Sequence, residues 1–344
     1  MKPSSSRRFE WLFLLSSCCF TYGLFLDGWA HNHLSSALET FFTPWHAVFY
    51  AGFFLCVVTL LAWLQRNRQK RLSWSKAIPA GHGLSLIGLE IFFLGGLADM
   101  AWHLQFGVEA DIEALLSPTH LVLATGMILI LSGGMRHFWA THAPSDKRTF
   151  AEAFPLICSL TLSIAVVLFM TQFAHYTDFE VTGLLPKDTF HPQALSVSGI
   201  LLFSIALIGG LSLPLRREAL PFGTVTFLLT ALVCAFGLMR SGTELLPAAL
   251  LAGMTGDLIA SAMPPTAVTR IRGFSFLVPF VFYACAFPLL MLSDGIWWSV
   301  HMWAGAPFLA GFAGLLISFV GWPLRDALTE RKGVFQRFCA IIGL

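Results

Sequence analysis

The chain is poor in charged residues. Of its 344 residues 12% are charged and 56% are hydrophobic, against about 25% charged in an ordinary soluble domain. Its net charge of +2 at pH 7 leaves no basic surface of the size that nucleic-acid phosphates need. The composition therefore argues against a soluble globular domain and against nucleic-acid binding.

The chain also lacks the motifs of several familiar sites. Its seven cysteines lie in apolar runs or in the C-terminal tail and form no CxxC pair: Cys18, Cys19, Cys56, Cys158, Cys234, Cys285 and Cys339. We therefore expect no disulfide framework. No GxxxxGK, GxSxG or HExxH pattern occurs, so the corresponding nucleotide-binding, hydrolase and zinc-protease sites are not indicated.

Long apolar runs are abundant, and they are about as long as the ~20 residues that cross a hydrocarbon core. A helix satisfies its backbone polar groups internally in lipid, and the sequence shows no alternating barrel pattern. We predict an all-α polytopic membrane protein with about ten transmembrane helices. The expected spans are 10–26, 44–65, 81–104, 118–140, 153–175, 192–215, 220–240, 245–262, 273–292 and 296–321.

The basic residues predict the orientation of the spans. With the N-terminus in the cytoplasm, 19 of the 21 lysines and arginines fall on the cytoplasmic side, and only Lys187 and Arg240 fall outside. Eleven of the 19 acids fall on the outer side instead. The positive-inside rule thus predicts a multi-pass protein of the cell membrane with both termini cytoplasmic.

The first span also has the form of a signal peptide. Arg7 and Arg8 precede its apolar run, and Gly28 and Ala30 stand as in a cleavage site. Cleavage after Ala30 would remove Asp27, which the repeat described next requires. We therefore expect the span to be retained.

Histidines reveal an internal repeat of about 72 residues. His31, His103 and His175 are 72 residues apart at the outer ends of odd-numbered spans, and each is followed by a second histidine, His46, His120 or His191. Such a period indicates a repeated helical hairpin. We predict a single domain, 1–344. Its repeats lie at about 10–80, at about 81–152 and, in a degenerate third copy, at about 153–217. They are followed by C-terminal helices at 218–322 and a cytoplasmic tail at 323–344.

The first two copies share the pattern D-x3-H followed by E-x3-[ST]-P-x-H. In copy one these residues are Asp27, His31, Glu39, Thr43, Pro44 and His46; in copy two they are Asp99, His103, Glu113, Ser117, Pro118 and His120. The acid and the first histidine share one helix face. The hydroxyl residue is a natural N-cap and the proline fits the first helical position, so the second histidine begins the returning helix. Each hairpin should therefore aim one carboxylate and two imidazoles at one depth.

Carboxylates and neutral imidazoles together predict a transition-metal centre on the outer face, which would hold copper, zinc or iron. The expected ligands are Asp27, His31, His46, Asp99, His103, His120, His175, His191 and His301. Glu39 and Glu113 are either further ligands or hydrogen-bond partners of the ligating imidazoles. We expect His33, His82, His137 and His142 to be ordinary interfacial or loop residues.

Two acids are predicted inside the membrane. Glu90 lies 13 residues before His103, and Asp257 lies 13 residues after Glu244, which places both about 20 Å below the outer face. An ionisable group in hydrocarbon costs at least about 2.5 kcal/mol, so a functional role is the default interpretation. They would share a proton or form a proton path; the alternative is that each is protonated and hydrogen-bonded to a helix backbone.

The D-x3-H-x14-H and D-x3-H-x16-H segments resemble the D-x3-H-x12-H copper motif in the membrane C subunit of particulate methane and ammonia monooxygenases. The matching positions are Asp27, His31 and His46, or Asp99, His103 and His120. In that family the aspartate and both histidines bind a metal near the outer leaflet. The resemblance covers less than about one tenth of the chain, and it implies a copper-containing oxidase or monooxygenase acting on a lipophilic substrate.

The sequence leaves three classes of function open. The first is a metal-dependent oxidase, monooxygenase or hydrolase with its site facing the periplasm or the outside, with or without a partner subunit to complete it. The second is a metal-ion or proton-coupled transporter that uses Glu90 and Asp257. The third is a membrane assembly protein without chemistry. An enzyme should tolerate Glu90→Gln, whereas a transporter should not.

Overall fold

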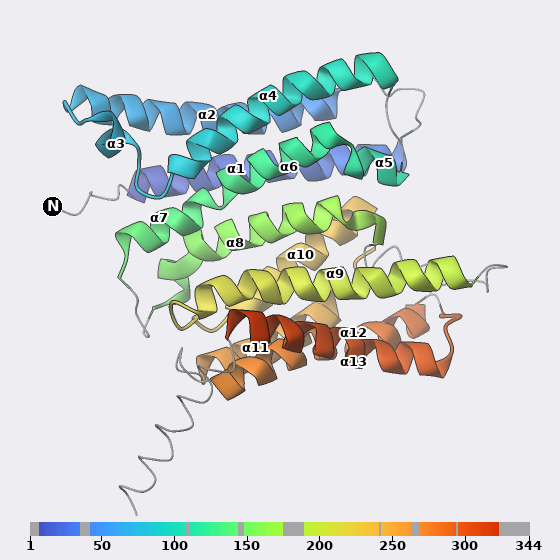
Figure 1. Ribbon diagram of the computed structural model, residues 1–344. Coiled ribbons are helices and arrows are strands. Elements are labelled where there is room, and N and C mark those ends of the chain that lie inside the picture. Colours follow the sequence, from blue (N-terminus) through green and yellow to red (C-terminus); the bar gives the residue numbers. More distant parts are fainter. Residues whose placement is uncertain are drawn as a thin grey trace, which may run out of the picture. The chain divides into compact units, whose positions relative to one another are not determined.

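The computed structural model describes residues 7–34, 42–107, 111–143, 148–174, 189–240, 242–262, 268–293 and 295–322. Within these ranges the chain is helical and has no strand (Figure 1). The helices are α1 (Arg7–His33), α2 (Pro44–Gln69), α3 (Trp74–Ala77), α4 (Gly83–Phe106), α5 (Asp111–Leu116), α6 (Pro118–Leu131), α7 (Gly133–Thr141), α8 (Phe150–Met170), α9 (Phe190–Leu215), α10 (Thr224–Arg240), α11 (Leu246–Ser261), α12 (Val268–Ser293) and α13 (Val300–Gly321). A short 3-10 turn, Gln172–Ala174, follows α8.

Eight helical segments are long and apolar enough to cross a membrane: α1, α2, α4, α6 with α7, α8, α9, α12 and α13. This confirms a helical, multi-pass membrane protein. The apolar helices α10 and α11 have 17 and 16 residues, fewer than the ~20 that span a hydrocarbon core. Ten spans and the cytoplasmic placement of the termini therefore remain predictions.

The chain divides into two compact units. The first comprises Met1–Ala143, Glu152–Phe173 and Cys234–Thr243. It holds α1 to α7, most of α8 and the end of α10. The second comprises Pro144–Ala151, Ala174–Val233 and Glu244–Leu344, and it holds α9, α11, α12, α13 and most of α10.

The first unit is built around two helical hairpins, α1 with α2 and α4 with α6, whose helices pack along their lengths. Glycines allow the backbones to approach. A Cβ atom at Gly52 of α2 would lie 2.4 Å from the Cα of Phe20 in α1, and one at Gly126 of α6 would lie 2.8 Å from the backbone nitrogen of Phe92 in α4. Small residues are the usual means of close helix packing in membranes. Both hairpins therefore close at equivalent positions, six residues after His46 and His120.

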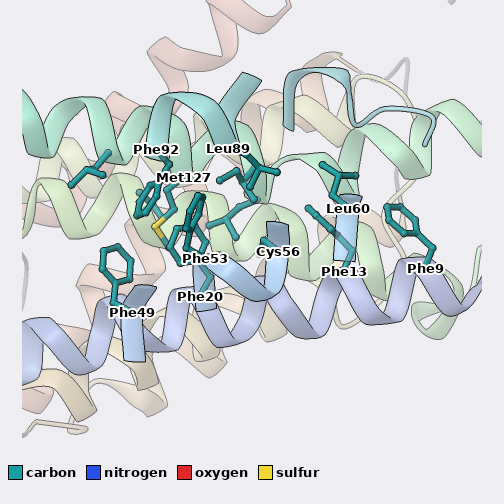
Figure 2. Close-up of a cluster of buried hydrophobic side chains, with 14 residues drawn as sticks. Phe9, Phe13, Phe20, Phe49, Phe53, Cys56, Leu60, Leu89, Phe92 and Met127 are labelled. Carbon is teal, nitrogen blue, oxygen red and sulfur yellow. The ribbon is translucent and has the colours of Figure 1, made fainter. Parts of the chain in front are cut away.

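Aromatic side chains join the two hairpins in a buried cluster (Figure 2). The ring centroid of Phe92 in the second hairpin lies 4.9 Å from that of Phe20 and 4.6 Å from that of Phe53, both in the first hairpin. Aromatic pairs at this separation stabilise packing beyond the area that they bury. Phe92 thus holds the hairpins side by side, so that the helix ends that carry the histidines lie at the same end of the unit.

Candidate metal centre

The first hairpin brings Asp27, His31 and His46 together. Asp27 and His31 lie one turn apart near the end of α1, and His46 lies in the first turn of α2. The Asp27 Oδ2 atom is 3.7 Å from the Nε2 of His31 and 3.5 Å from the Nε2 of His46. One ligand atom from each residue lies within 4.8 Å of the others, so the three side chains converge on one point.

The second hairpin repeats this arrangement with Asp99, His103 and His120. The Nε2 of His103 is 3.5 Å from Asp99 Oδ2, and the Nε2 of His120 is 3.4 Å from Asp99 Oδ1. Their ligand atoms also lie within 4.8 Å of one another. The Asp99 side chain is more buried than that of Asp27, at 3% against 14% exposed, so the second group is the more enclosed.

The acid–imidazole distances fit shared coordination of an ion. Two ligands of one tetrahedral ion with bonds near 2.1 Å lie about 3.4 Å apart, whereas N–H···O hydrogen bonds are about 2.7–3.2 Å long. All four distances fall between 3.4 and 3.7 Å. The buried Asp27 Oδ1 also has no hydrogen-bond partner, which leaves a lone pair for an ion. The donor set fits copper, zinc or iron.

Cap hydroxyls hold the second histidine of each group. Thr43 Oγ1 accepts the backbone N–H of His46 at 3.2 Å and lies 3.1 Å from its Nδ1. Ser117 Oγ accepts the backbone N–H of His120 at 3.5 Å and lies 2.7 Å from its Nδ1. With Nδ1–H donating to the hydroxyl, the Nε2 lone pair faces the aspartate, as a metal ligand requires. The sequence predicted both caps but not this second contact.

Further hydrogen bonds position the second group. The Thr119 hydroxyl donates to Asp99 Oδ1 at 2.7 Å, and the His103 Nδ1 lies 3.2 Å from the carbonyl oxygen of Gly107, the C-cap of α4. Because a carbonyl only accepts, Nδ1 must carry the proton of that bond. In the neutral ring the lone pair is then on Nε2, which lies 3.5 Å from Asp99 Oδ2.

The two groups are neighbours, and Tyr50 lies beside both. Asp27 interacts electrostatically with Asp99 and with His120. Tyr50, one turn after His46, interacts electrostatically with both aspartates, and a Cβ atom at Gly96 would lie 3.0 Å from its hydroxyl oxygen. Copy two has Ala124 at the equivalent position. Tyr50 therefore breaks the symmetry of the repeat at the point where the two groups meet; the histidine pattern gave no signal for it.

No family model, curated protein or solved structure matches the chain. The resemblance to the monooxygenase C subunit rests on the motif alone and stays a prediction.

The other predicted ligands lie elsewhere. His191 begins α9 and His301 begins α13; both are exposed and belong to neither group. His175 and Glu39 lie outside the described residues. Glu113 of α5 is exposed, and its side chain makes no hydrogen bond within the described part of the chain. The hydrogen-bond partners of the second histidines are therefore the cap hydroxyls and not Glu113.

The two predicted intramembrane acids have different surroundings. Asp257 is fully buried in α11 and accepts hydrogen bonds from the backbone N–H groups of Val225 and Thr226 and from the Thr226 hydroxyl, at 2.8, 3.1 and 2.6 Å. It thereby satisfies free donors at the first turn of α10. Glu90 is exposed on α4. The structure thus gives Asp257 a structural role, and a proton path through either acid stays a prediction.

His82, a loop residue before α4, and His137 of α7 are more buried than the sequence indicated. Their exposed fractions are 1% and 4%, because both pack against the aromatic rings at the start of α1. The centroid of the His82 ring lies 4.4 Å from that of Phe13, and the centroid of His137 lies 5.6 Å from that of Phe9. His33 and His142 are exposed, as interfacial residues would be.

Proposed function

We propose that the chain is a membrane metalloenzyme in which each Asp/His/His group binds one transition-metal ion, with copper favoured. The pair of sites would face the periplasm or the outside and act as an oxidase or monooxygenase on a lipophilic substrate from the bilayer. The observation that carries the proposal is the duplicated convergence of one carboxylate and two Nε2 atoms at 3.4–3.7 Å.

The ligand number favours catalysis over a structural role. Structural sites usually supply four protein ligands, whereas catalytic sites supply three and keep a position open. Each group here offers three: Asp27 with His31 and His46, and Asp99 with two equivalent histidines. The His31 side chain is 35% exposed, so a small molecule has access to the first group from its rim.

The residues of the site have distinct tasks. Each aspartate supplies one negative charge that offsets the charge of an ion, and the hydroxyls of Thr43 and Ser117 orient the second histidine. Tyr50 places a phenol near both aspartates, where it would orient a bound molecule. A bound copper ion would supply redox chemistry with dioxygen, and a bound zinc ion would instead activate water for hydrolysis.

Copper is favoured for two reasons. Imidazole suits copper, and in the divalent series copper forms the most stable complexes with such ligands. The predicted outer location also gives access to copper. A zinc-dependent hydrolase is the runner-up within the same proposal, and metal content of the protein purified from its own membrane separates the two.

Activity in proteoliposomes separates an enzyme from a transporter. The purified chain is loaded with copper and reconstituted, and two rates are measured: oxygen consumption with a quinol as electron donor and a lipophilic hydrocarbon present, and copper uptake into the vesicles. The variants are His103→Ala, Glu90→Gln and, as a matched control from the exposed part of α1, His33→Ala.

We expect oxygen consumption in the wild type, in His33→Ala and in Glu90→Gln, and its loss in His103→Ala. Uptake should not exceed that of empty vesicles. The transporter would be supported instead if the wild type took up copper, if both His103→Ala and Glu90→Gln abolished this uptake, and if no variant consumed oxygen. Neither activity in the copper-loaded wild type would contradict the copper enzyme and leave the zinc-dependent hydrolase and the non-catalytic assembly protein; metal content then separates these two.

A further inference from the structure

A second polar cluster lies at the other end of α1. Glu10 is 17 residues before Asp27, which is about 25 Å along a helix. Its carboxylate lies beside His137 of α7. Both residues line a pocket with His82, the residue before α4, and with Phe13, Leu131 and Phe138. All of these residues belong to the first unit. The cluster is therefore separate from the two outer groups.

The His137 ring is held in the tautomer of a metal ligand. Its Nδ1 lies 2.6 Å from the carbonyl oxygen of Ala80, which can only accept, so Nδ1 carries a proton. Its Nε2 lies 3.2 Å from Glu10 Oε1 yet has no hydrogen-bond partner. If Nε2 carries no proton, its lone pair and the carboxylate oxygen repel at this distance, and a cation between them removes that repulsion. A carbonyl behind the ring and a carboxylate beside it are the usual surroundings of a ligating histidine.

His82 brings a second imidazole, with one buried nitrogen that has no hydrogen-bond partner. Its exposed fraction is 1%, its buried Nδ1 has no partner, and it caps α4 without a side-chain hydrogen bond. A buried polar group left unsatisfied costs about 1–3 kcal/mol, and such a group in a native structure calls for a bound water or ion. The ring lies edge-on to Phe13 beside the pocket.

The spacing of this cluster matches that of the outer groups. The ring centroids of His82 and His137 are 5.4 Å apart, against 5.5 Å for His103 and His120 and 6.2 Å for His31 and His46. The acid–imidazole distance of 3.2 Å is shorter than the 3.4–3.7 Å found there, so the two side chains would separate slightly around an ion. Among the described residues only the outer groups have all their ligand atoms within 4.8 Å, so His82 would turn inward to complete coordination.

Two opposite charges lie near the cluster. The Arg136 guanidinium opposes a positive charge at His82, and the Glu10 carboxylate beside His137 favours one. The N–H groups of Arg136 donate to the carbonyl oxygens of Gly81 and Leu129 and to the hydroxyls of Ser85 and Ser132.

We propose that Glu10, His82 and His137 form a third transition-metal site, for an ion of the Zn²⁺ or Co²⁺ class, at the end of the first unit opposite the paired groups. The pocket beside the three side chains offers room for the ion and a small fourth ligand such as water. This inference does not depend on the proposed enzyme, because it concerns binding at different residues.

The test uses Co²⁺ on the full-length protein in detergent, because its visible d–d bands report tetrahedral nitrogen and oxygen ligands. The background variant is Asp27→Ala with Asp99→Ala, which removes the carboxylate from each outer group. We expect this variant to bind one Co²⁺ per chain with d–d bands. Adding His82→Gln should remove the bands and weaken binding more than ten-fold, and adding His142→Gln, an exposed histidine of the same region, should change neither.

Two results would overturn the proposal. One is a background variant that binds no Co²⁺, and the other is binding that His82→Gln leaves unchanged. If His82→Gln fails to fold, as judged from its thermal transition, Glu10→Gln in the same background decides. Glu10→Gln must then weaken Co²⁺ binding, and unchanged binding overturns the proposal equally.

Discussion

At the scale of single residues, the candidate metal centre depends on hydrogen bonds to Nδ1 that turn the Nε2 atom of each second histidine toward the aspartate. Ser117 serves two purposes, since one oxygen caps α6 and holds the Nδ1 of His120. Thr43 does the same for α2 and His46. The start of the returning helix and the orientation of its ligand are thus fixed by one hydroxyl group.

Replacing Ser117 by Ala should weaken metal binding at the second group about 10–100-fold, the usual effect of losing a partner behind a ligating imidazole. The lost cap should also lower stability by about 0.5–2 kcal/mol. Isothermal titration with Zn²⁺ measures the affinity. Ser117→Thr keeps a hydroxyl and should restore it, and the first group should be unaffected in both variants. Equal affinity in Ser117→Ala and wild type would show that the hydroxyl only caps the helix.

His82 should make the stability of the metal-free protein depend on pH. Its pKa is lowered in the folded state, chiefly by burial, so below about pH 6.5 the unfolded chain binds a proton that the folded chain does not. The contribution of neutral His82 to the free energy of unfolding is fully present above about pH 6.5. As the pH falls toward the pKa of the folded state, this free energy decreases by at most about 1.4 kcal/mol per pH unit.

Thermal transitions of EDTA-treated protein between pH 8 and pH 5 measure this effect. The wild type should lose stability below about pH 6.5, and His82→Gln should lose less. An identical pH dependence in the two proteins would contradict the assignment of the effect to His82.

At the scale of helices, the crossing of α1 and α2 positions the ligands as much as their sequence does. Asp27 and His46 come from different helices, and their separation follows from the close approach at Gly52 and Phe20. The same holds for Asp99 and His120, through Gly126 and Phe92. A site of this kind tolerates displacements of only about 0.5 Å before its ligands lose their geometry.

Gly52→Ala should therefore impair the first metal group and spare the second. The new Cβ atom would lie 2.4 Å from the Cα of Phe20, so the helices must separate. We expect at least a ten-fold loss of Zn²⁺ affinity at the first group in titrations of the purified protein. Gly209→Ala in α9 is the control, because nothing lies within 4 Å of its Cβ position. Unchanged affinity in Gly52→Ala would mean that the crossing does not position the site.

Asp257 should stabilise α10 without taking part in metal binding. In Asp257→Ala the N–H groups of Val225 and Thr226 lose their acceptor, at about 1–3 kcal/mol for each buried donor. The transition temperature of Asp257→Ala should fall by several degrees while its metal content stays unchanged. The transition temperature of Asp257→Asn should lie between those of Asp257→Ala and the wild type. Metal loss at an unchanged transition temperature would instead support the proton-path interpretation.

At the scale of the whole molecule, hydropathy predicted the helices well because each span must be long and apolar. The pattern D-x3-H with a capped second histidine predicted both groups that the structure brings together, because helix geometry alone puts Asp27 and His31 on one face. The degenerate third repeat forms no such group within the described residues. No aspartate lies four residues before His175, the histidine that the repeat pairs with His191. His191 and His301 are both exposed.

What the sequence did not predict depends on contacts between distant segments. Glu10, His82 and His137 are far apart in the chain and share no motif, so only the packing of α1 against the segments around α4 and α7 unites them. Tyr50 belongs to no repeated pattern. The hydrogen bonds of Asp257 likewise join two helices, α11 and α10, and periodicity within one helix carries no signal for them.

Metal stoichiometry of the full-length, detergent-purified protein tests the central claim most directly. After copper supplementation, elemental analysis and EPR are compared among the wild type, His31→Ala, His103→Ala and the control His33→Ala. The account predicts that His31→Ala and His103→Ala each lose one copper per chain, together with its nitrogen hyperfine signal, and that His33→Ala loses none. A wild type without bound metal, or stoichiometry that neither ligand variant changes, would contradict it.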